Sequence, residues 1–353
     1  MAKIAIITDT HFGASKSDEW LLQKQMDFIQ GTFFPSLVEH HIFDVIHMGD
    51  VFDNRQNLNT KMLDTVYSGF FAPLRDSGVN LRILLGNHDI YYKNTNRYHS
   101  LFPLPDIFDN VTLLDCFDDY MIAGEPFAAF PWINNDNLEQ ALNHTKTSHA
   151  RYAIGHTNII GFEMQRGRLA DYGLTAETFK RFNLFLTGHF HLRSRKGNIV
   201  YTGNPYYLTW ADYNTEKGFA ILDTETGELS YIANPDDPYA RLQYEDIVHS
   251  TFDPAAYQGK ILELQVKDFA VSDHAEFRVL VDELQKACYK FNMTVQSNIE
   301  TVSDLSEAVK LDSNGGISTK DTILACIDGI EVQGMDKSRI KNILGKLYEG
   351  AQA

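Results

Sequence analysis

Five short segments of the sequence place aspartate, asparagine or histidine at the end of an apolar run. They are Asp9-Thr10-His11, Gly49-Asp50, Gly86-Asn87-His88-Asp89, Gly155-His156 and Gly188-His189-Phe190-His191. Carboxylate and amide oxygens bind hard divalent cations, and imidazole nitrogens bind transition metals, so a site that mixes them suits manganese or iron better than calcium. Because Asp50 can bridge two cations with its two carboxylate oxygens, the working hypothesis is a paired metal site.

The apolar runs before these residues are rich in branched side chains, as in buried strands. Four of them are followed by glycine, which allows a sharp turn that points the next polar side chain out of the sheet end. One core histidine at such a place would be unremarkable. The same placement at four strand ends is hard to explain by packing, so chemistry is the favoured interpretation.

Residues 18–39 and 60–76 have the spacing of amphipathic helices that alternate with the strands, which predicts a β-α-β start. The apolar stripe of residues 60–76, which includes Tyr67 and Phe70, is wide. Core packing and a subunit interface both stay open for it. Short strands are expected at 111–114, 120–123 and 127–130, and a hairpin at 218–223 and 228–232 should close the sheet.

Composition limits the class of protein. The 353 residues are 44% hydrophobic and carry a formal net charge of −16, which argues against coating nucleic acid by bulk electrostatics. No apolar run is as long as a membrane span, and the first residues lack the layout of a secretory signal, so we expect a soluble intracellular protein. The three cysteines lie far apart without metal-ligand spacing, which argues against a disulfide framework.

A second small domain is expected after a polar break at 235–238. A linking strand at 241–251 should precede a strand, helix and strand at 259–268, 273–291 and 293–300. This part shows no catalytic set of its own. Beyond it, two short amphipathic segments at 319–330 and 336–349 follow a joint at Ser313-Asn314-Gly315-Gly316. Their apolar faces must be covered either by a partner or by the parent domain.

In order and spacing, the five metal-type segments resemble the motifs of the calcineurin-like metallophosphoesterase superfamily over about residues 1–235. Within this superfamily, the chain resembles the SbcD-type DNA-repair nucleases, particularly their short bacterial and phage members. The features that carry this resemblance are the motif Gly49-Asp50-Val51-Phe52-Asp53, the turn Gly203-Asn204-Pro205 and the small domain that follows. The resemblance implies an α/β fold, a four-layer αββα sandwich with a small cap at 240–302 and C-terminal helices within 303–353.

The resemblance also implies two Mn²⁺ ions, with Mg²⁺ or Fe²⁺ as alternatives. One ion would be held by Asp9, His11, Asp50 and His191, and the other by Asp50, Asn87, His156 and His189. Such a pair can activate a bridging water for attack on a phosphoester. His88 is the candidate to protonate the leaving oxygen, with Asp53 as its orienting partner.

The function so implied is that of a manganese-dependent DNA exonuclease or endonuclease subunit in an SbcCD-type repair and recombination complex. It would act on double-stranded DNA ends as a homodimer in the cytoplasm of a bacterium or a phage-infected cell. The cap would guide DNA, unless it is a stabilising appendage, and residues 303–353 would bind the coiled coil of an SbcC-type ATPase. The rival interpretations are a metallophosphoesterase acting on phosphoproteins or small nucleotides, and a scaffold with structural metals.

Basic side chains in loops after the site-bearing strands are candidate DNA contacts, although exposed bases are often only solvating charge. The loop at 91–98 adds amides and aromatic rings, for which packing is the simpler role. The candidates are Lys93, Arg97, Arg166, Arg168, Arg193 and Arg195.

Overall fold

The computed structural model describes residues 2–248, 252–267, 275–295, 339 and 341. The chain divides into two compact units, one formed by Met1–Ala240 with Gly259–Ile261 and the other by Arg241–Gln258 with Leu262–Ala353. Among the described residues, no helix is both long and apolar enough to cross a bilayer. The predicted segments 319–330 and 336–349 lie outside the described residues, apart from residues 339 and 341 within the second segment.

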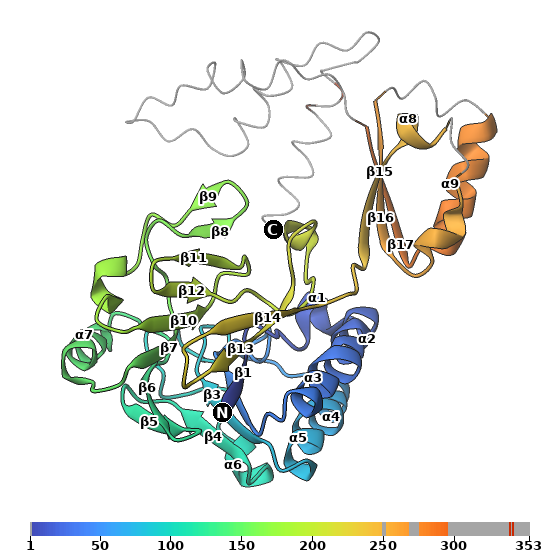
Figure 1. Ribbon diagram of the computed structural model, residues 1–353. Helices are drawn as coiled ribbons and strands as arrows, with labels where there is room; N and C mark the ends of the chain where they lie inside the picture. Colours follow the sequence, from blue (N-terminus) through green and yellow to red (C-terminus); the bar gives the residue numbers. More distant parts are fainter. Residues whose placement is uncertain (1, 249–251, 268–274, 296–338, 340, 342–353) are drawn as a thin grey trace, which may run out of the picture. The chain divides into compact units, whose positions relative to one another are not determined.

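The first unit contains two six-stranded sheets (Figure 1). The first sheet has the strand order β14-β13-β1-β2-β3-β4, in which β1 to β4 are parallel and β13 runs antiparallel to β1. The predicted closing hairpin therefore forms the edge of this sheet. Its strands are β1 (Lys3–Ile7), β2 (Asp44–His47), β3 (Asn80–Leu84), β4 (Val111–Leu114), β13 (Gly218–Asp223) and β14 (Leu229–Ala233).

The second sheet has the order β11-β12-β10-β7-β6-β5, with β6, β7, β10 and β12 parallel. The segments after residue 111 were expected to widen one sheet, but only β4 joins the first, while β5 and β6 begin the second. Its strands are β5 (Asp119–Ile122), β6 (Glu125–Phe130), β7 (Tyr152–His156), β10 (Leu184–Gly188), β11 (Ser194–Lys196) and β12 (Ile199–Tyr201).

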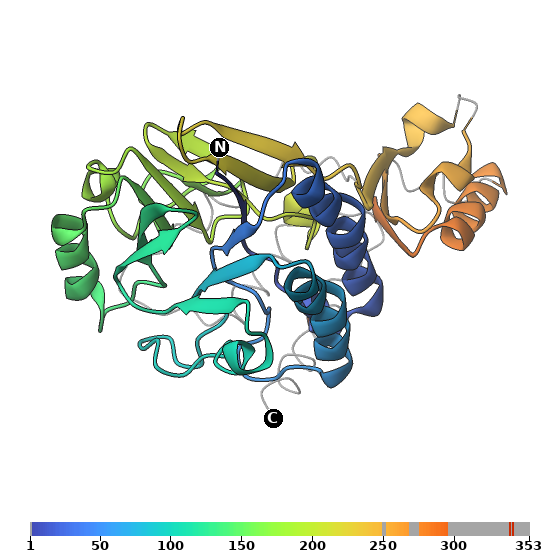
Figure 2. The ribbon, with the colours of Figure 1, turned by 60° about the horizontal axis from the view of Figure 1, so that its bottom comes forward.

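Successive side chains of a strand point to opposite faces of its sheet, and this alternation places them in different layers of the core. On β1, Ile4 and Ile6 pack with Ile154 and Leu186 of the second sheet, while Ala5 and Ile7 face the core under the helices. The outer face of the second sheet packs against α7 (Leu138–Thr147) and η3 (Ala176–Phe179). The predicted four-layer αββα sandwich is therefore confirmed, with helices on both outer faces (Figure 2).

Two long helices cover the first sheet, and each contains a π-helical turn. Pro35 and Pro73 lack the N–H that an α-helix would need there, and their rings crowd the carbonyl one turn earlier. The ladder widens just before each proline, because Phe34 N–H bonds Ile29 O and Ala72 N–H bonds Tyr67 O. The pieces are α2 (Glu19–Phe28), η1 (Ile29–Phe33), α3 (Phe34–Glu39), α4 (Thr60–Val66), η2 (Tyr67–Phe71) and α5 (Ala72–Asp76).

The wide apolar stripe of the second helix is mostly core. Phe70 is fully buried, and its ring packs on Phe12 and Phe33, while the half-buried Tyr67 packs on Phe71 and Phe108. The subunit-interface interpretation is therefore wrong for Phe70, because a side chain that is buried within its own chain cannot contact a partner.

The second unit contains a three-stranded sheet of order β15-β16-β17 and the helix α9 (Ala275–Ala287), which buries Phe277 and Leu284. The linking strand expected at 241–251 is wrong in extent: β15 spans Tyr239–Gln243, and a helical turn, α8 (Tyr244–Ile247), follows it. The expected β-α-β unit thus has a third strand. The other strands are β16 (Ile261–Val266) and β17 (Lys290–Val295).

Short elements complete the chain. Among them, α1 is a left-handed turn, because Ser15, Lys16 and Ser17 all have positive φ. These elements are α1 (Ala14–Ser17), α6 (Leu104–Ile107), β8 (Glu163–Gln165), β9 (Arg168–Leu169), η4 (Trp210–Asp212) and η5 (Pro254–Tyr257).

Candidate metal centre

The metal-type residues meet where the carboxyl ends of strands from both sheets come together. The first sheet contributes the turns after β1, β2 and β3, and the second sheet contributes the end of β7 and the turn after β10. The structure brings together all seven ligand candidates, which are Asp9, His11, Asp50, Asn87, His156, His189 and His191.

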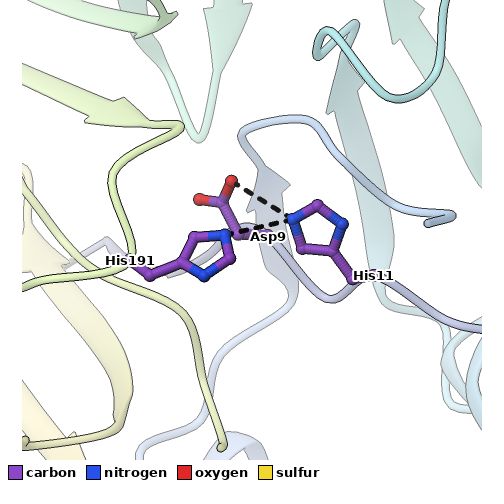
Figure 3. Close-up of side chains that lie close together, drawn as sticks. All are labelled: Asp9, His11 and His191. Atoms are coloured by element: carbon purple, nitrogen blue, oxygen red, sulfur yellow. Dashed lines mark hydrogen bonds and ion pairs between the residues drawn. The ribbon is translucent and has the colours of Figure 1, made fainter. Parts of the chain in front are cut away.

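The first cluster consists of Asp9, His11 and His191, whose potential ligand atoms all lie within 4.8 Å of one another. Figure 3 shows the three side chains pointing toward one another. Nε2 of His11 lies 3.2 Å from Nε2 of His191 and 4.0 Å from Oδ1 of Asp9. Two imidazole nitrogens that face each other need a proton or a cation between their lone pairs.

The second cluster consists of Asp50, His156 and His189, and the amide of Asn87 joins it. Oδ1 of Asn87 lies 2.7 Å from Nδ1 of His189 and 3.1 Å from Nε2 of His156. Oδ2 of Asp50 lies 3.3 Å from Nε2 of His156 and 3.6 Å from Nε2 of His11. The carboxylate of Asp50 therefore lies between the two clusters, as a ligand shared by two ions would.

The donor set fits a pair of divalent cations. Asp9 and Asp50 are 0% and 1% exposed, and buried carboxylates of this kind require a compensating positive charge. The nitrogens and oxygens that converge on each cluster are a mixture that transition metals of the manganese and iron type bind.

Four of the ligand candidates have strained backbones. Asp9, His11, Asp50 and His189 have φ values of 52°, 41°, 55° and 90°, in the left-handed region that side chains other than glycine seldom adopt. Such strain persists only where the surrounding structure imposes it, and it gathers at functional sites.

The glycines before the ligands serve close approach as well as turning. A Cβ at Gly86 would lie 2.1 Å from Oδ1 of Asp50, and a Cβ at Gly188 would lie 2.1 Å from Oγ1 of Thr8. Neither glycine has a positive φ, whereas Gly49 does, at 95°. The sequence interpretation of a sharp turn therefore holds for Gly49, while Gly86 and Gly188 are required by the space between neighbouring turns.

Asp89 holds the first-sheet turns together. Its carboxylate accepts hydrogen bonds from the backbone N–H groups of Asp50, Val51 and Gly86 at 2.8, 3.0 and 2.8 Å. Burial and the nearby charge of Asp50 raise the pKa of Asp89 to about 7. Sequence reasoning quoted Asp89 only as part of a motif; its position directly after Asn87-His88 was the available signal.

Hydrogen bonds select which ring nitrogen faces each cluster. Nδ1 of His156 lies 2.7 Å from the carbonyl of Met48, so it donates there and leaves Nε2 free for a ligand role. Nδ1 of His11 lies 3.3 Å from Oδ1 of Asp53, which directs Nε2 of His11 toward Asp9 and Asp50.

The histidines of the centre have pKa values shifted in opposite directions. Burial alone would lower the pKa of His156, but the charge of Asp50 outweighs it and raises the pKa to about 9. Burial and the charge of His156 lower the pKa of His189 to about 3. Burial, followed by His11, also lowers the pKa of His191. The centre thus holds His189 and His191 neutral, as metal ligands must be, whereas its carboxylate charge raises the pKa of His156.

His88 lies beside the first cluster, outside the two predicted ligand sets, and it forms a third group of ligand-type side chains with His11 and Asp53. Its ring is 4.7 Å from the ring of His11, and its Nδ1 donates to the backbone carbonyl of Asp53 at 2.6 Å. The carboxylate of Asp53 instead contacts His11. Asp53 therefore orients His88 through its main chain and His11 through its side chain, a division that the sequence could not show.

A buried lysine holds the loop that carries His191. Nζ of Lys217, a residue that is 2% exposed, donates to Oδ1 of Asp212 at 2.6 Å and to the carbonyl of His191 at 3.2 Å. It also bonds Oδ1 of Asn204, in the Gly203-Asn204-Pro205 turn. Sequence reasoning missed Lys217 and Asp212, which carry no local motif.

The candidate DNA contacts do not form one cluster. Lys93 lines a groove with His88 and Asp53, whereas Arg97 lines a different pocket and lies over the ring of Tyr98. Arg193 pairs with Glu216 and lies over Tyr231. The remaining candidates are exposed: Arg166, which donates to the carbonyl of Asn214, Arg168 on β9, and Arg195, which donates to the carbonyl of Gly197.

The fold and this two-cluster centre define a metal-dependent phosphoesterase. The model of the calcineurin-like phosphoesterase family matches residues 2–193, and the chain belongs to this family. The sequence-based identification of the superfamily and the prediction of a metal-dependent hydrolase of phosphoesters are therefore confirmed.

The chain is also similar to individual proteins of known name. The chain is 30% identical to exonuclease subunit 1 of Enterobacteria phage T4 over 321 residues, 88% of this chain and 87% of the relative. It is 25% identical to the DNA double-strand break repair protein Mre11 of Nanoarchaeum equitans over 62% of this chain and 66% of the relative. A solved structure of an archaeal phosphodiesterase aligns at 16% identity over 66% of this chain and 99% of its own, with a TM-score of 0.33. The resemblance to SbcD-type nucleases agrees with the first two.

Proposed function

We propose that the chain is a manganese-dependent DNA nuclease subunit that hydrolyses phosphodiesters within an SbcCD-type repair and recombination complex. The observation that carries the proposal is the position of Asp50 between two clusters of ligand-type side chains, with His88 beside them. The similarity to a phage exonuclease subunit over 88% of this chain supports DNA as the substrate.

The residues of the two clusters would hold the two ions. Asp9, His11 and His191 would bind one, Asn87, His156 and His189 the other, and Asp50 both. When bound, such a pair supplies an activated water and neutralises the charge on the phosphate. The chain contributes the orientation of these side chains: His156 donates to the carbonyl of Met48, His11 contacts the carboxylate of Asp53, and Lys217 donates to the carbonyl of His191.

His88 is the proposed proton donor to the leaving oxygen. Since Nδ1 donates to the carbonyl of Asp53, only Nε2 remains for a substrate. The ring is half-buried and lines an open groove, so a phosphodiester can reach it without a movement of the core. A donor placed in this way accelerates bond cleavage by about 10²- to 10⁴-fold.

The remaining proposals concern partners. We assign DNA guidance to the chain segment 240–302. We assign binding of an SbcC-type coiled-coil ATPase to residues 303–353, which lie outside the described residues apart from 339 and 341. A homodimer stays part of the proposal, with exposed residues of the helices rather than Phe70 in the interface. Cytoplasmic action in a bacterium or a phage-infected cell completes it.

Substrate discrimination tests the proposal. The purified chain is incubated in Mn²⁺ with linear duplex DNA, a phosphopeptide and a cyclic nucleotide, and product is measured for each. Turnover of DNA alone is expected. Turnover of the phosphopeptide or the cyclic nucleotide without DNA would assign the chain to the rival class of phosphoesterases.

Candidate phosphate contacts have their own test. Neutralising Arg97 and Arg166 together is expected to weaken DNA binding and to flatten its dependence on salt. With fewer phosphate contacts, binding releases fewer counterions. An unchanged salt slope would remove both residues from the DNA footprint.

A further inference from the structure

An open groove of about 520 Å³ adjoins the metal centre on the side of His88. Its walls are two chain segments, the polar turn after Asp53 and the start of the loop after Asp89. The lining includes Asp53, Arg55, His88, Tyr91, Tyr92 and Lys93. Since His88 and Asp53 both contact or face His11, the groove begins where the phosphate would be cut.

Aromatic rings in this loop are left uncovered. Tyr91, Tyr92 and Tyr98 are 42%, 52% and 52% exposed, and three exposed rings in contact form a patch, unlike exposed rings that are scattered singly. Tyr91 and Tyr92 pack edge to face with ring centroids 4.7 Å apart, and Tyr92 lies 6.1 Å from Tyr98. The simpler role of core packing does not account for these rings.

The loop is anchored by other residues, so its rings are free to serve a ligand. The backbone N–H of Tyr91 bonds the carbonyl of Tyr98 at 2.7 Å, which closes the neck of the loop. The side chain of Asn96 donates to the carbonyl of Trp132 at 2.9 Å and accepts from Asn134. The aromatic wall is therefore held in place before any ligand binds, which reduces the ordering cost of binding.

Positive charge stands beside the rings. Among the described residues, neither Arg55 nor Lys93 has an ion-pair partner, in a chain whose net charge is −16. A groove that combines exposed aromatic faces with unpaired cations matches a nucleotide, whose base stacks while its phosphates pair. A base in the interior of a duplex must leave the base stack before a protein ring can stack on it.

We propose that Tyr91 and Tyr92 form a stacking subsite for an unpaired base next to the phosphate that is cut. This inference rests on the proposed function and deepens it, because it makes a single-stranded or locally melted end the form of DNA that enters the centre. Arg55 and Lys93 bind the phosphates that flank that base.

The test compares a short fluorescent oligonucleotide of thymidines with the same backbone carrying abasic residues throughout. Binding is followed by fluorescence anisotropy in EDTA, where no metal-dependent cutting occurs, and KM and kcat are measured in Mn²⁺. The double change Tyr91→Ala and Tyr92→Ala is expected to weaken binding of the thymidine strand by a factor on the order of 10 to 100. KM should rise by more than kcat falls.

Three comparisons make the result specific. The wild-type chain should bind the abasic strand as weakly as the double alanine variant binds thymidines, and that variant should lose nothing further on the abasic strand. Phenylalanine at both positions should restore binding. The matched control is Tyr172→Ala, which removes a ring that is 50% exposed and does not line the groove, and it should change nothing.

The two proposals fail in different ways. A wild-type chain that cuts no DNA contradicts the proposed function, while the anisotropy comparison still decides the subsite. If the double alanine variant binds thymidine and abasic strands as the wild-type chain does, the subsite is wrong even when DNA is cut. Equal weakening on both strands also overturns it, because the rings would then not read a base.

Discussion

The two sheets build the metal centre by different means. The first sheet supplies all the oxygen ligand candidates, together with His11, and Asp9, His11 and Asp50 have left-handed backbones. The second sheet supplies imidazoles, and His156 is still part of the regular strand β7. The oxygens of the first sheet are fixed by backbone N–H groups, because His88 N–H bonds Asp50 at 2.7 Å and His189 N–H bonds Asp9 at 3.0 Å.

This difference shows that neither half can be preorganised alone. The N–H that fixes Asp9 belongs to the second sheet, and the carbonyl of Met48 that orients His156 belongs to the first. A Cβ at Gly188 would meet Thr8 at 2.1 Å, so the sheets approach as closely as backbones allow. The position of the two sheets relative to each other therefore determines the geometry of the ligands.

The largest expected effect concerns Lys217, which precedes β13 of the first sheet and anchors the loop that carries His191. Lys217→Met removes a buried ammonium and leaves Asp212 as a buried charge without its partner. Breaking one side of such a pair costs about 3–5 kcal/mol in the free energy of unfolding. Urea unfolding measures this, and Mn²⁺ affinity should fall because the His191 loop loses its anchor.

A double change separates the two roles of Lys217. Adding Asp212→Asn to Lys217→Met removes the unpaired charge, so part of the lost stability should return. Mn²⁺ affinity should stay low in both variants. If stability returns and Mn²⁺ affinity returns with it, Lys217 does not position His191.

His88 tests whether the first-sheet turns carry chemistry besides ligands. His88→Ser is expected to lower DNA hydrolysis by a factor on the order of 10² or more, since the leaving oxygen loses its proton donor. Both ions should stay bound, because His88 belongs to neither ligand set. A lower metal content in this variant would make His88 a ligand and reject its assigned role.

Gly86→Ala tests the close approach of the first-sheet turns. The new methyl group would lie 2.1 Å from Oδ1 of Asp50, and such overpacking costs about 1–3 kcal/mol. Thermal unfolding and Mn²⁺ binding should both be impaired. Gly31→Ala is the control, because no atom lies within 4 Å of its Cβ and alanine favours a helix by about 0.5–1 kcal/mol.

A smaller effect comes from His47, on β2 beneath the turns. Thr10 donates to the carbonyl of Val51, so its hydroxyl accepts from Nε2 of His47 at 2.9 Å. Burial and the charge of His156 lower the pKa of His47 to about 3. In the unfolded chain the pKa of this histidine is about 6.5, so between pH 6.5 and pH 3 the unfolded chain binds a proton that the folded chain does not. The free energy of unfolding therefore has its full value above pH 6.5 and decreases as the pH falls toward 3.

The size of this loss is about 1.4 kcal/mol per pH unit within that window. His47→Gln keeps a donor toward Thr10 and removes the titration, so its unfolding free energy should depend less steeply on pH. Urea unfolding of both chains at several pH values measures the difference. Equal slopes would mean that His47 takes up no extra proton on unfolding.

That the ligand candidates lie together could be predicted, because Gly-Asp, Gly-Asn and Gly-His after an apolar run are local signals. The four-layer fold was predicted from the resemblance of these motifs to the calcineurin-like metallophosphoesterase superfamily. The role of Asp89 could not be predicted, since its bonds to Asp50 and Val51 exist only after two turns meet. Lys217 lies 26 residues beyond His191, and no local pattern connects them.

Prolines gave a signal that the sequence interpretation left unused. Pro35 and Pro73 interrupt helical patterns, which predicts a local change of ladder, and the structure has π-helical turns there. The wide stripe around Phe70 was ambiguous for a physical reason. A helix between a sheet and another helix buries more than one face, and this width resembles that of an exposed interface.

The central claim is that both sheets together hold two ions, with Asp50 shared between them. The most direct measurement is the number of Mn²⁺ ions bound per chain, by equilibrium dialysis, in the wild type, His191→Ala and His189→Ala. The account predicts two ions in the wild type and one in each variant. One ion in the wild type, or two in either variant, would contradict it.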